Sequence, residues 1–265
     1  MRARLRGRLP GLARLVAGLG LAATVTALVL LAGGSWLRVQ QIEATGATWT
    51  PASRIADLLE PLRGHALLTL DRRAVEARIG SLPGVAEARV ETYLPDRLTV
   101  AVTQETAAFV WRTSAVQLVC AADGTAIGQV ALGADLPDAL AGLPQVDDRR
   151  TASRNIVVGD RIPERELRTA LRLEGIEPAT MGSAAQRLTV RIEEQYGFIV
   201  VAPEIGWSAA FGYYGMDPQE GDADVAARVE LQAASVRTLF AEEPEASVEW
   251  VDARNPGRVY WRAKS

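Results

Sequence analysis

Alternating large apolar and polar residues in two neighbouring runs predict a β-hairpin at residues 85–103. In the run 97–103, every second residue is large and apolar, and a period of two is typical of a half-buried strand. The run 85–93 precedes it, and Pro95-Asp96 stands between the two runs. Proline presets φ and aspartate can bond its own backbone, so this pair favours a reversal of the chain.

Two amphipathic helices are predicted before the hairpin, because apolar residues recur there at helical spacing. The first helix follows Thr50-Pro51, with threonine as the N-cap and proline as the first helical residue. The second helix follows Asp71, which is a good N-cap. The apolar faces are Ile55, Leu58, Leu59 and Leu62 in the first helix and Val75, Ile79 and Leu82 in the second. With a strand at residues 38–45, the predicted order is strand, helix, helix, strand, strand.

Residues 107–265 are predicted to form a mixed β-sheet domain with flanking helices, so the whole chain is of the α+β class. Strands are expected at residues 109–111, 115–120, 126–130, 187–193, 197–202, 205–211, 247–251 and 258–262. Helices are expected at residues 163–173 and 225–240. Residues 133–154 contain two Leu-Pro pairs and are interpreted as a surface loop over the sheet. Residues 252–257 are expected to be the loop that joins the last two strands.

The longest apolar run, residues 15–37, carries no charge. About 20 residues of helix span the hydrocarbon core of a bilayer, so this run predicts one transmembrane helix. Five arginines and no acid precede it, which places residues 1–14 in the cytoplasm and the rest of the chain outside. A cleaved signal peptide is the alternative, with small residues at 32–35, but the run exceeds the usual length of about 7–15 apolar residues.

The charge of the chain depends on position. Lysine and arginine total 29 and aspartate and glutamate total 32, and five of the arginines precede residue 15. The part of the chain after the apolar run is therefore acidic. Nucleic-acid-binding domains need clustered positive charge, so nucleic acid is not an expected partner.

The single cysteine and the single histidine limit the chemistry that the chain can perform. Cys120 cannot form an intramolecular disulfide and is expected to be a small buried hydrophobe. His65 is expected in a solvated loop, with no second His or Cys to complete a zinc site. Acidic pairs such as Asp147-Asp148 are interpreted as solvated faces. No nucleophile–base pair, phosphate loop or metal-ligand cluster is found, so no enzyme activity, cofactor, metal or small-molecule substrate is expected.

Two ordered series of residues stand out, one around the predicted hairpin and one near the C-terminus. The first reads Leu82-Pro83-x-Val85-x-x-Ala88-x-Val90, followed by Pro95-x-x-Leu98-x-Val100-x-Val102-x-x-Glu105. The second reads Val251-Asp252-x-Arg254-x-Pro256-Gly257-Arg258-Val259. The module that carries the first series, directly behind one predicted membrane helix, resembles a POTRA domain. Both series resemble the FtsQ/DivIB family of bacterial division proteins, with departures at Gly84 and Asn255, where that family often has an aromatic residue.

The resemblance implies a cytoplasmic tail at residues 1–14, a transmembrane helix at 15–37, a POTRA domain at 38–106 and an FtsQ-type β domain at 107–265. It implies a non-enzymatic scaffold in the plasma (inner) membrane at the division septum, with the N-terminus in the cytoplasm and the C-terminus outside. Such a scaffold binds other bitopic division proteins, which are FtsL-like and FtsB/DivIC-like. It thereby links ring assembly to septal wall synthesis.

The resemblance also implies where partners bind. The partner-binding residues that it carries over, or that lie on the same last strand, are Asp252, Arg254, Asn255, Arg258, Val259, Tyr260 and Trp261. Tyr260 and Trp261 are neighbours on a predicted strand, so they must point to opposite faces and one faces away from the core. Either this pair lines a groove beside an edge that accepts a partner strand, or one ring packs and the other caps. For the POTRA domain, a recruitment surface is expected near residues 85–93.

Two other classes of protein are alternatives. A POTRA-bearing transport or assembly adaptor for exported proteins would usually have several POTRA modules and a cleaved signal, whereas one module and an anchor are predicted here. An exported hydrolase on a stalk would need a nucleophile and a base within reach of each other.

Overall fold

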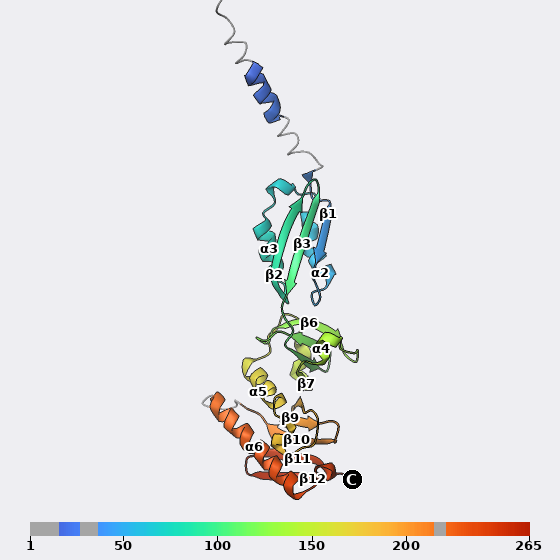
Figure 1. The fold of residues 1–265 in the computed structure, drawn as a ribbon, viewed down its shortest axis with the longest axis vertical. Coiled ribbons are helices and arrows are strands. Elements are labelled where there is room, and N and C mark those ends of the chain that lie inside the picture. The colour runs from blue at the N-terminus through green and yellow to red at the C-terminus, as the bar shows by residue number, and fades with distance from the viewer. Residues whose placement is uncertain (1–15, 27–36, 215–220) are drawn as a thin grey trace, which may run out of the picture. The chain divides into compact units, whose positions relative to one another are not determined.

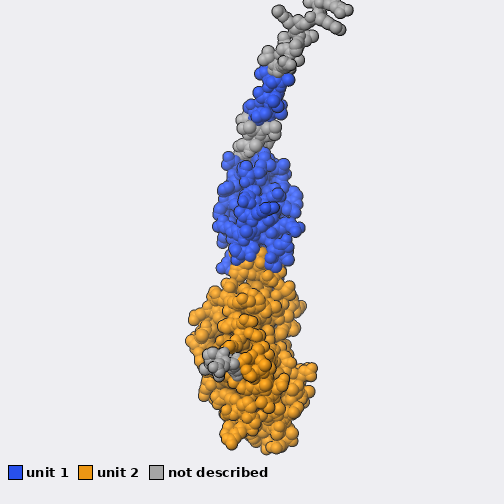
Figure 2. All heavy atoms as spheres, turned by 90° about the vertical axis from the view of Figure 1, so that its left-hand side faces the viewer, with its two compact units in different colours: residues 1–81, 86–103 blue, residues 82–85, 104–265 orange. Residues whose placement is uncertain are grey.

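The computed structural model describes residues 16–26, 37–214 and 221–265. The chain divides into two compact units, which Figure 2 shows in different colours. Unit 1 runs through Ser81 and resumes at Ala86–Thr103, whereas unit 2 comprises Leu82–Val85 and Gln104–Ser265. In the sequence, the segment Leu82–Val85 lies between the two parts of unit 1, but it belongs to unit 2.

The N-terminal region is described only in part. Residues 16–26 are helical. Among the described residues, no helix is both long and apolar enough to cross a membrane. The predicted tail at residues 1–14 lies outside the described residues, and so do residues 15 and 27–36 of the predicted span.

Unit 1 has the predicted order of strand, helix, helix, strand, strand (Figure 1). Its elements are β1 (Gln41–Thr45), α2 (Ala52–Leu59), α3 (Arg72–Gly80), β2 (Val85–Tyr93) and β3 (Arg97–Gln104), with single 3-10 turns at Glu60–Leu62 and Leu67–Thr69. β3 is the central strand of the three, and it is parallel to β1. The predicted apolar faces of both helices are buried at Ile55, Leu59, Val75 and Ile79. These helices therefore cover the small sheet as the sequence pattern indicates.

The predicted start of α3 is confirmed, whereas the predicted start of α2 is wrong by one residue. The side chain of Asp71 accepts a hydrogen bond from the backbone N–H of Ala74 at 3.1 Å, so the predicted N-cap of α3 is confirmed. α2 begins at Ala52, one residue later than predicted, and Pro51 rather than Thr50 directly precedes it. Pro51 has an extended ψ of 132°, which leaves it outside the helix.

Unit 2 is built on one nine-stranded sheet in the order β12-β11-β10-β9-β8-β7-β4-β5-β6. The strands are β4 (Phe109–Thr113), β5 (Val116–Cys120), β6 (Ala126–Ala131), β7 (Gln145–Asp148), β8 (Thr189–Glu193), β9 (Gly197–Ala202), β10 (Trp207–Gly212), β11 (Val248–Asn255) and β12 (Arg258–Ala263). The helices are α4 (Asp138–Ala141), α5 (Glu164–Glu174) and α6 (Asp222–Glu242), with 3-10 turns at Thr151–Asn155, Pro178–Met181 and Glu245–Ser247. α5 packs on β7–β9 and α6 on β10–β12, and both contribute to one core that contains Trp111 and Trp207.

The prediction of a surface loop at residues 133–154 is wrong. This stretch contains α4 and also β7, which lies inside the sheet and pairs in parallel with both β4 and β8. β7 has four residues, and Val146 is the apolar one among them. Such a strand is too short and too polar to show a hydrophobic period, and its partners are distant in sequence.

The interpretation of Asp148 as a solvated residue is also wrong, because Asp148 is fully buried. Its carboxylate accepts a hydrogen bond from Trp111 Nε1 at 3.2 Å and forms a bidentate pair with Arg150 at 2.9 and 2.7 Å. Arg150 Nη2 also lies 2.5 Å from Glu166 Oε2 on α5. Hydrogen bonds to Asp148 and then to Glu166 raise the pKa of the Arg150 guanidinium. This network ties the end of β7 to α5.

The segment Leu82–Val85 requires glycine at position 84. Gly84 has a φ of +81°, and a Cβ there would lie 2.7 Å from the carbonyl oxygen of Ile127. We expect Gly84→Ala to lower the free energy of unfolding by about 1–3 kcal/mol, as measured by chemical denaturation. Gly133→Ala is the matched control, because Gly133 has the same φ but a Cβ there meets nothing within 4 Å. Equal losses in the two variants would contradict a role for the close approach to Ile127.

Cys120 is buried as predicted, and burial raises the pKa of its thiol to about 12. The thiolate is the reactive form of cysteine. We therefore expect Cys120 in the folded chain to resist a thiol reagent such as DTNB at mildly alkaline pH, and to react fully after unfolding in guanidinium. Rapid labelling of the folded chain would show that this part of the core opens.

Candidate interaction edge at strand β12

The large sheet ends at β12 on one side and at β6 on the other. At β6, Ala126 donates its N–H to the carbonyl of Asp160 at 2.8 Å and accepts the N–H of Gly159 at 2.8 Å. The chain itself therefore occupies the start of the β6 edge. Among the described residues, β12 pairs with β11 alone, so β12 is the edge at which a further strand can be added.

The backbone ladder shows which groups of β12 point away from the sheet. Lys264 donates its N–H to the carbonyl of Ser247 on the β11 side at 2.8 Å. Successive pairs of an antiparallel ladder alternate between hydrogen-bonded and non-hydrogen-bonded. The N–H and C=O of Ala263 therefore point to the open side, and the same alternation turns the backbone groups of residues 259 and 261 outward.

Tyr260 and Trp261 point to opposite faces of the sheet, as predicted. Trp261 lies opposite Val251, which belongs to the main core, and Tyr260 lies opposite Asp252. Directly opposed residues share a face, so Trp261 is on the face that α6 covers and Tyr260 is on the other. Tyr260 is 62% exposed and Trp261 is 39% exposed. Both rings are therefore accessible beside the open edge.

The prediction that residues 252–257 form a loop is wrong for its first part. Asp252, Arg254 and Asn255 lie in β11, which pairs with β12 as far as Asn255 opposite Arg258. The remaining turn contains Gly257, with a φ of +80°. The polar residues before Pro256-Gly257 suggested a long loop. In the structure, β11 and β12 stay paired as far as Asn255 and Arg258, so the turn between them is short.

Arg254 already binds a carboxylate within the chain. Its Nε and Nη2 donate to the two oxygens of Asp252 at 2.8 and 2.6 Å, and its guanidinium lies 5.5 Å from the centre of the Tyr196 ring. The side-chain hydrogen bond between the pair lowers the pKa of Asp252 and raises the pKa of Arg254. The Arg254 side chain is still 42% exposed, so it can meet a partner in an orientation that Asp252 and Tyr196 fix.

The face that carries Tyr260 and Asp252 also includes Tyr196 and Trp250. Neither of these two residues was predicted from the sequence to take part in binding. Their rings are 4.8 Å apart. Trp250 lies opposite Arg262, whose guanidinium binds Glu249 at 2.9 and 3.1 Å. Tyr196 belongs to the turn between β8 and β9, so only the tertiary fold brings it beside β11. In the sequence, the glycine that follows Tyr196 indicates that this residue lies in a hairpin turn, but not that it approaches β11.

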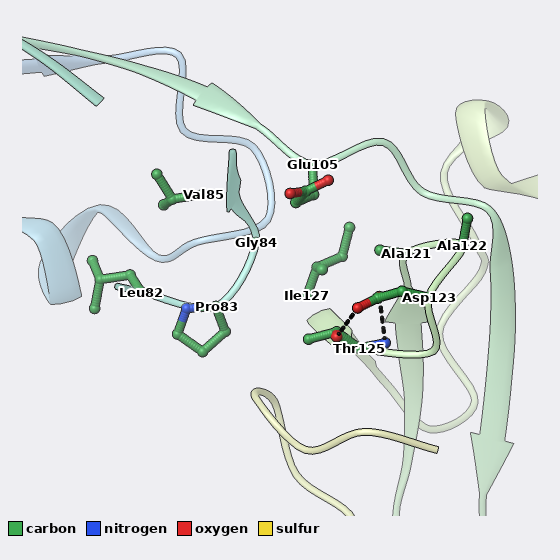
Figure 3. A pocket seen from close by; sticks show the side chains of 10 residues that line it. All are labelled: Leu82, Pro83, Gly84, Val85, Glu105, Ala121, Ala122, Asp123, Thr125 and Ile127. Carbon is green, nitrogen blue, oxygen red and sulfur yellow. Dashed lines mark hydrogen bonds between the residues drawn. The ribbon is translucent and has the colours of Figure 1, made fainter. Parts of the chain in front are cut away.

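A separate hollow of about 500 Å³ lies in unit 2 beside the segment Leu82–Val85 (Figure 3). It is lined by Leu82, Pro83, Gly84, Val85, Glu105, Ala121, Ala122, Asp123, Thr125 and Ile127. The Asp123 carboxylate accepts hydrogen bonds from the N–H and Oγ1 of Thr125 at 3.0 and 2.9 Å, and it pairs with Arg161 at 3.2 Å. These contacts stabilise the β5–β6 turn, and we assign the hollow no chemistry. Within the part of the chain that the structure describes, no group of three or more His, Cys, Asp or Glu residues could hold a metal ion.

Residues 37–104 match the family model described as "POTRA domain, FtsQ-type". Residues 37–104 therefore form a POTRA domain of the FtsQ type. Over 114 residues, the chain is 32% identical to the cell division protein FtsQ of Chloroflexus aurantiacus and 29% identical to that of Chloroflexus aggregans. The aligned part covers 43% of this chain and 42% of each relative, so the chain spans about two fifths of the curated relatives it matches. The POTRA match and the FtsQ relatives confirm the resemblance to the FtsQ/DivIB family that the hairpin motif indicated.

Proposed function

We propose that this protein is a non-enzymatic scaffold of bacterial cell division that binds other bitopic division proteins, of the FtsL and FtsB/DivIC types, outside the membrane. The FtsQ-type POTRA domain and two relatives named as cell division proteins support this process. In this proposal, residues 15–37 anchor the chain in the plasma membrane at the septum, with residues 1–14 in the cytoplasm. The scaffold thereby links ring assembly inside the cell to wall synthesis outside.

The open edge of β12 is the observation that carries the proposal. An added strand would meet the outward backbone groups of residues 259, 261 and 263, and each hydrogen bond contributes about 0.5–1.5 kcal/mol net. These backbone bonds supply affinity, and partner side chains at alternate positions supply register and choice. On one face those side chains meet Tyr260, and on the other they meet Trp261.

The charge of this edge favours a partner strand with acidic side chains. Arg258, Arg262 and Lys264 lie in or directly after β12, and residues 258–264 contain no acid. Arg254 adds a fourth cation on the neighbouring strand, where Asp252 binds Arg254 and Glu249 binds Arg262, so the edge keeps a net positive charge that is smaller than four. Opposite charges across an interface fix register and exclude wrong partners more than they add affinity.

The second surface of the proposal is the β2 edge of the POTRA domain, at residues 85–93. β2 is an outer strand of the three-stranded sheet. The N–H of Val90 is already bound by Glu76 Oε1 at 2.9 Å, so a side chain of α3 covers one position of this edge. Backbone groups of successive strand residues alternate in direction, so we expect a partner at β2 to use residues 88 and 92, which share the open side with Val90.

Co-purification from crosslinked cells tests the proposed function. FtsL-like and FtsB-like chains should be recovered with the full-length protein, and a fluorescent fusion should concentrate at midcell. Recovery of a different membrane complex without those chains would overturn the scaffold assignment.

A further inference from the structure

One end of the POTRA domain is made of three segments that backbone hydrogen bonds tie together. The N–H of Val39 donates to the carbonyl of His65 at 3.0 Å, and the N–H of Gln40 donates to the carbonyl of Asp96 at 2.9 Å. β1 and β3 are parallel, so both strands start at this end (Figure 1). The beginning of the domain, the loop after α2 and the β2–β3 turn therefore lie together.

This end begins where the uncharged stretch at residues 15–37 stops. One residue, Arg38, separates that stretch from Val39, which is 1% exposed within the domain. A single residue spans at most about 3.6 Å. The inference rests on the membrane anchor of the proposed function: with residues 15–37 in a bilayer, no linker holds this end of the domain away from the lipid headgroups.

Large apolar side chains project from this end. Leu94 in the β2–β3 turn is 66% exposed, and Tyr93 at the end of β2 is 50% exposed. Leu68, two residues after the bridge between Ala66 and Arg38, is 60% exposed. Tyrosine is enriched at the membrane–water interface, and leucine is typical of the apolar side of interfacial elements.

Two arginines at this end are paired within the chain. Arg63 binds Glu60 at 2.8 Å, and Arg97 lies 3.7 Å from Glu43. Anionic lipid would have to compete with these carboxylates. Arg38 keeps its charge at this end, with its Nη1 donating to the carbonyl of Gly64 at 3.2 Å, but the contact through Tyr93, Leu94 and Leu68 is apolar and does not require an acidic headgroup.

We propose that the POTRA domain rests on the phospholipid bilayer through Tyr93, Leu94 and Leu68, with the β2–β3 turn inserted at the level of the headgroups. The bilayer is the occupant because the apolar stretch ends one residue before the folded domain. This contact adds a second attachment to the anchor and restrains the direction in which the domain stands on the membrane.

The test uses the full-length chain in nanodiscs of phosphatidylcholine, with Cys120→Ala as the background. The environment-sensitive fluorophore NBD is attached at Leu94→Cys, and in a second chain at Leu68→Cys. The matched control is Leu231→Cys on α6, another exposed leucine at 58% exposure. Quenching by phosphatidylcholine that carries a doxyl group near the headgroup should be several-fold stronger at positions 94 and 68 than at 231. It should not increase when phosphatidylglycerol is added.

Equal quenching at positions 94, 68 and 231 in chains that stay with the nanodisc would overturn the lipid contact while leaving the anchor intact. Release of the chain from membranes by alkaline carbonate would overturn the anchor, and with it the contact. A β12 variant that loses partner binding but keeps the quenching at position 94 would separate a failure of the scaffold function from a failure of this inference.

Discussion

Replacing Arg150 with methionine is expected to lower the free energy of unfolding by about 3–5 kcal/mol, because removal of one partner of a buried ion pair leaves an uncompensated charge. Asp148 is 0% exposed, and Arg150 binds both of its oxygens. Without Arg150, Trp111 Nε1 at 3.2 Å is, among the described residues, the remaining side-chain donor to the carboxylate. Glu166 also loses its contact with Arg150, so the link between β7 and α5 is broken.

The neighbouring arginine provides the control for this prediction. Arg149 pairs with Asp147 at 2.8 Å, but its side chain is 54% exposed. Exposed ion pairs contribute about 0–1 kcal/mol, so Arg149→Met should have little effect. Guanidinium unfolding followed by tryptophan fluorescence measures both variants. Similar small losses would show that the Asp148 site is open to water.

Replacing Tyr260 with alanine is expected to weaken binding of an FtsB-like partner by about 2 kcal/mol, or roughly thirtyfold in Kd. Tyrosine is among the residues that most often dominate interfaces, and Tyr260 stands beside the outward backbone groups of β12. Because its side chain is 62% exposed, the truncation should leave the stability of the fold nearly unchanged. Titration of purified partner into the detergent-solubilised chain measures the effect.

Leu132→Ala is the control for this truncation, since Leu132 is a large side chain that is 49% exposed and directly follows β6, at the other end of the sheet. It should leave the affinity for the same partner unchanged. Equal losses from the two variants would show that the effect is not specific to β12, and no loss from Tyr260→Ala would remove Tyr260 from the interface.

The helices and the hairpin of the POTRA domain were predictable because each is determined by residues that are close together in the sequence. Its helices show an apolar period in Ile55 and Leu59 and in Val75 and Ile79, and its hairpin alternates over many residues. The large sheet was less predictable because β7 inserts between β4 and β8 through parallel, long-range pairs. A four-residue strand that ends in a buried aspartate has the sequence of a loop.

The candidate edge was predictable in part. That Tyr260 and Trp261 face opposite ways follows from the geometry of any strand, and the sheet order adds that this strand is the last one. The pairing of Arg254 with Asp252, and the approach of Tyr196 to Trp250, depend on how the strands lie side by side. Such contacts cannot be read from the spacing of residues along the chain.

Strand addition at β12 is tested most directly by Ala263→Pro, with Ala263→Thr as its matched control. The N–H of Ala263 points to the open side, so proline removes an edge donor without breaking the ladder to β11. Calorimetric titration with a purified FtsB-like partner should show about two- to thirteenfold weaker binding for the proline variant, which is the value of one hydrogen bond, and unchanged binding for the threonine variant. Wild-type affinity in Ala263→Pro would contradict the proposal that partners add a strand to this edge.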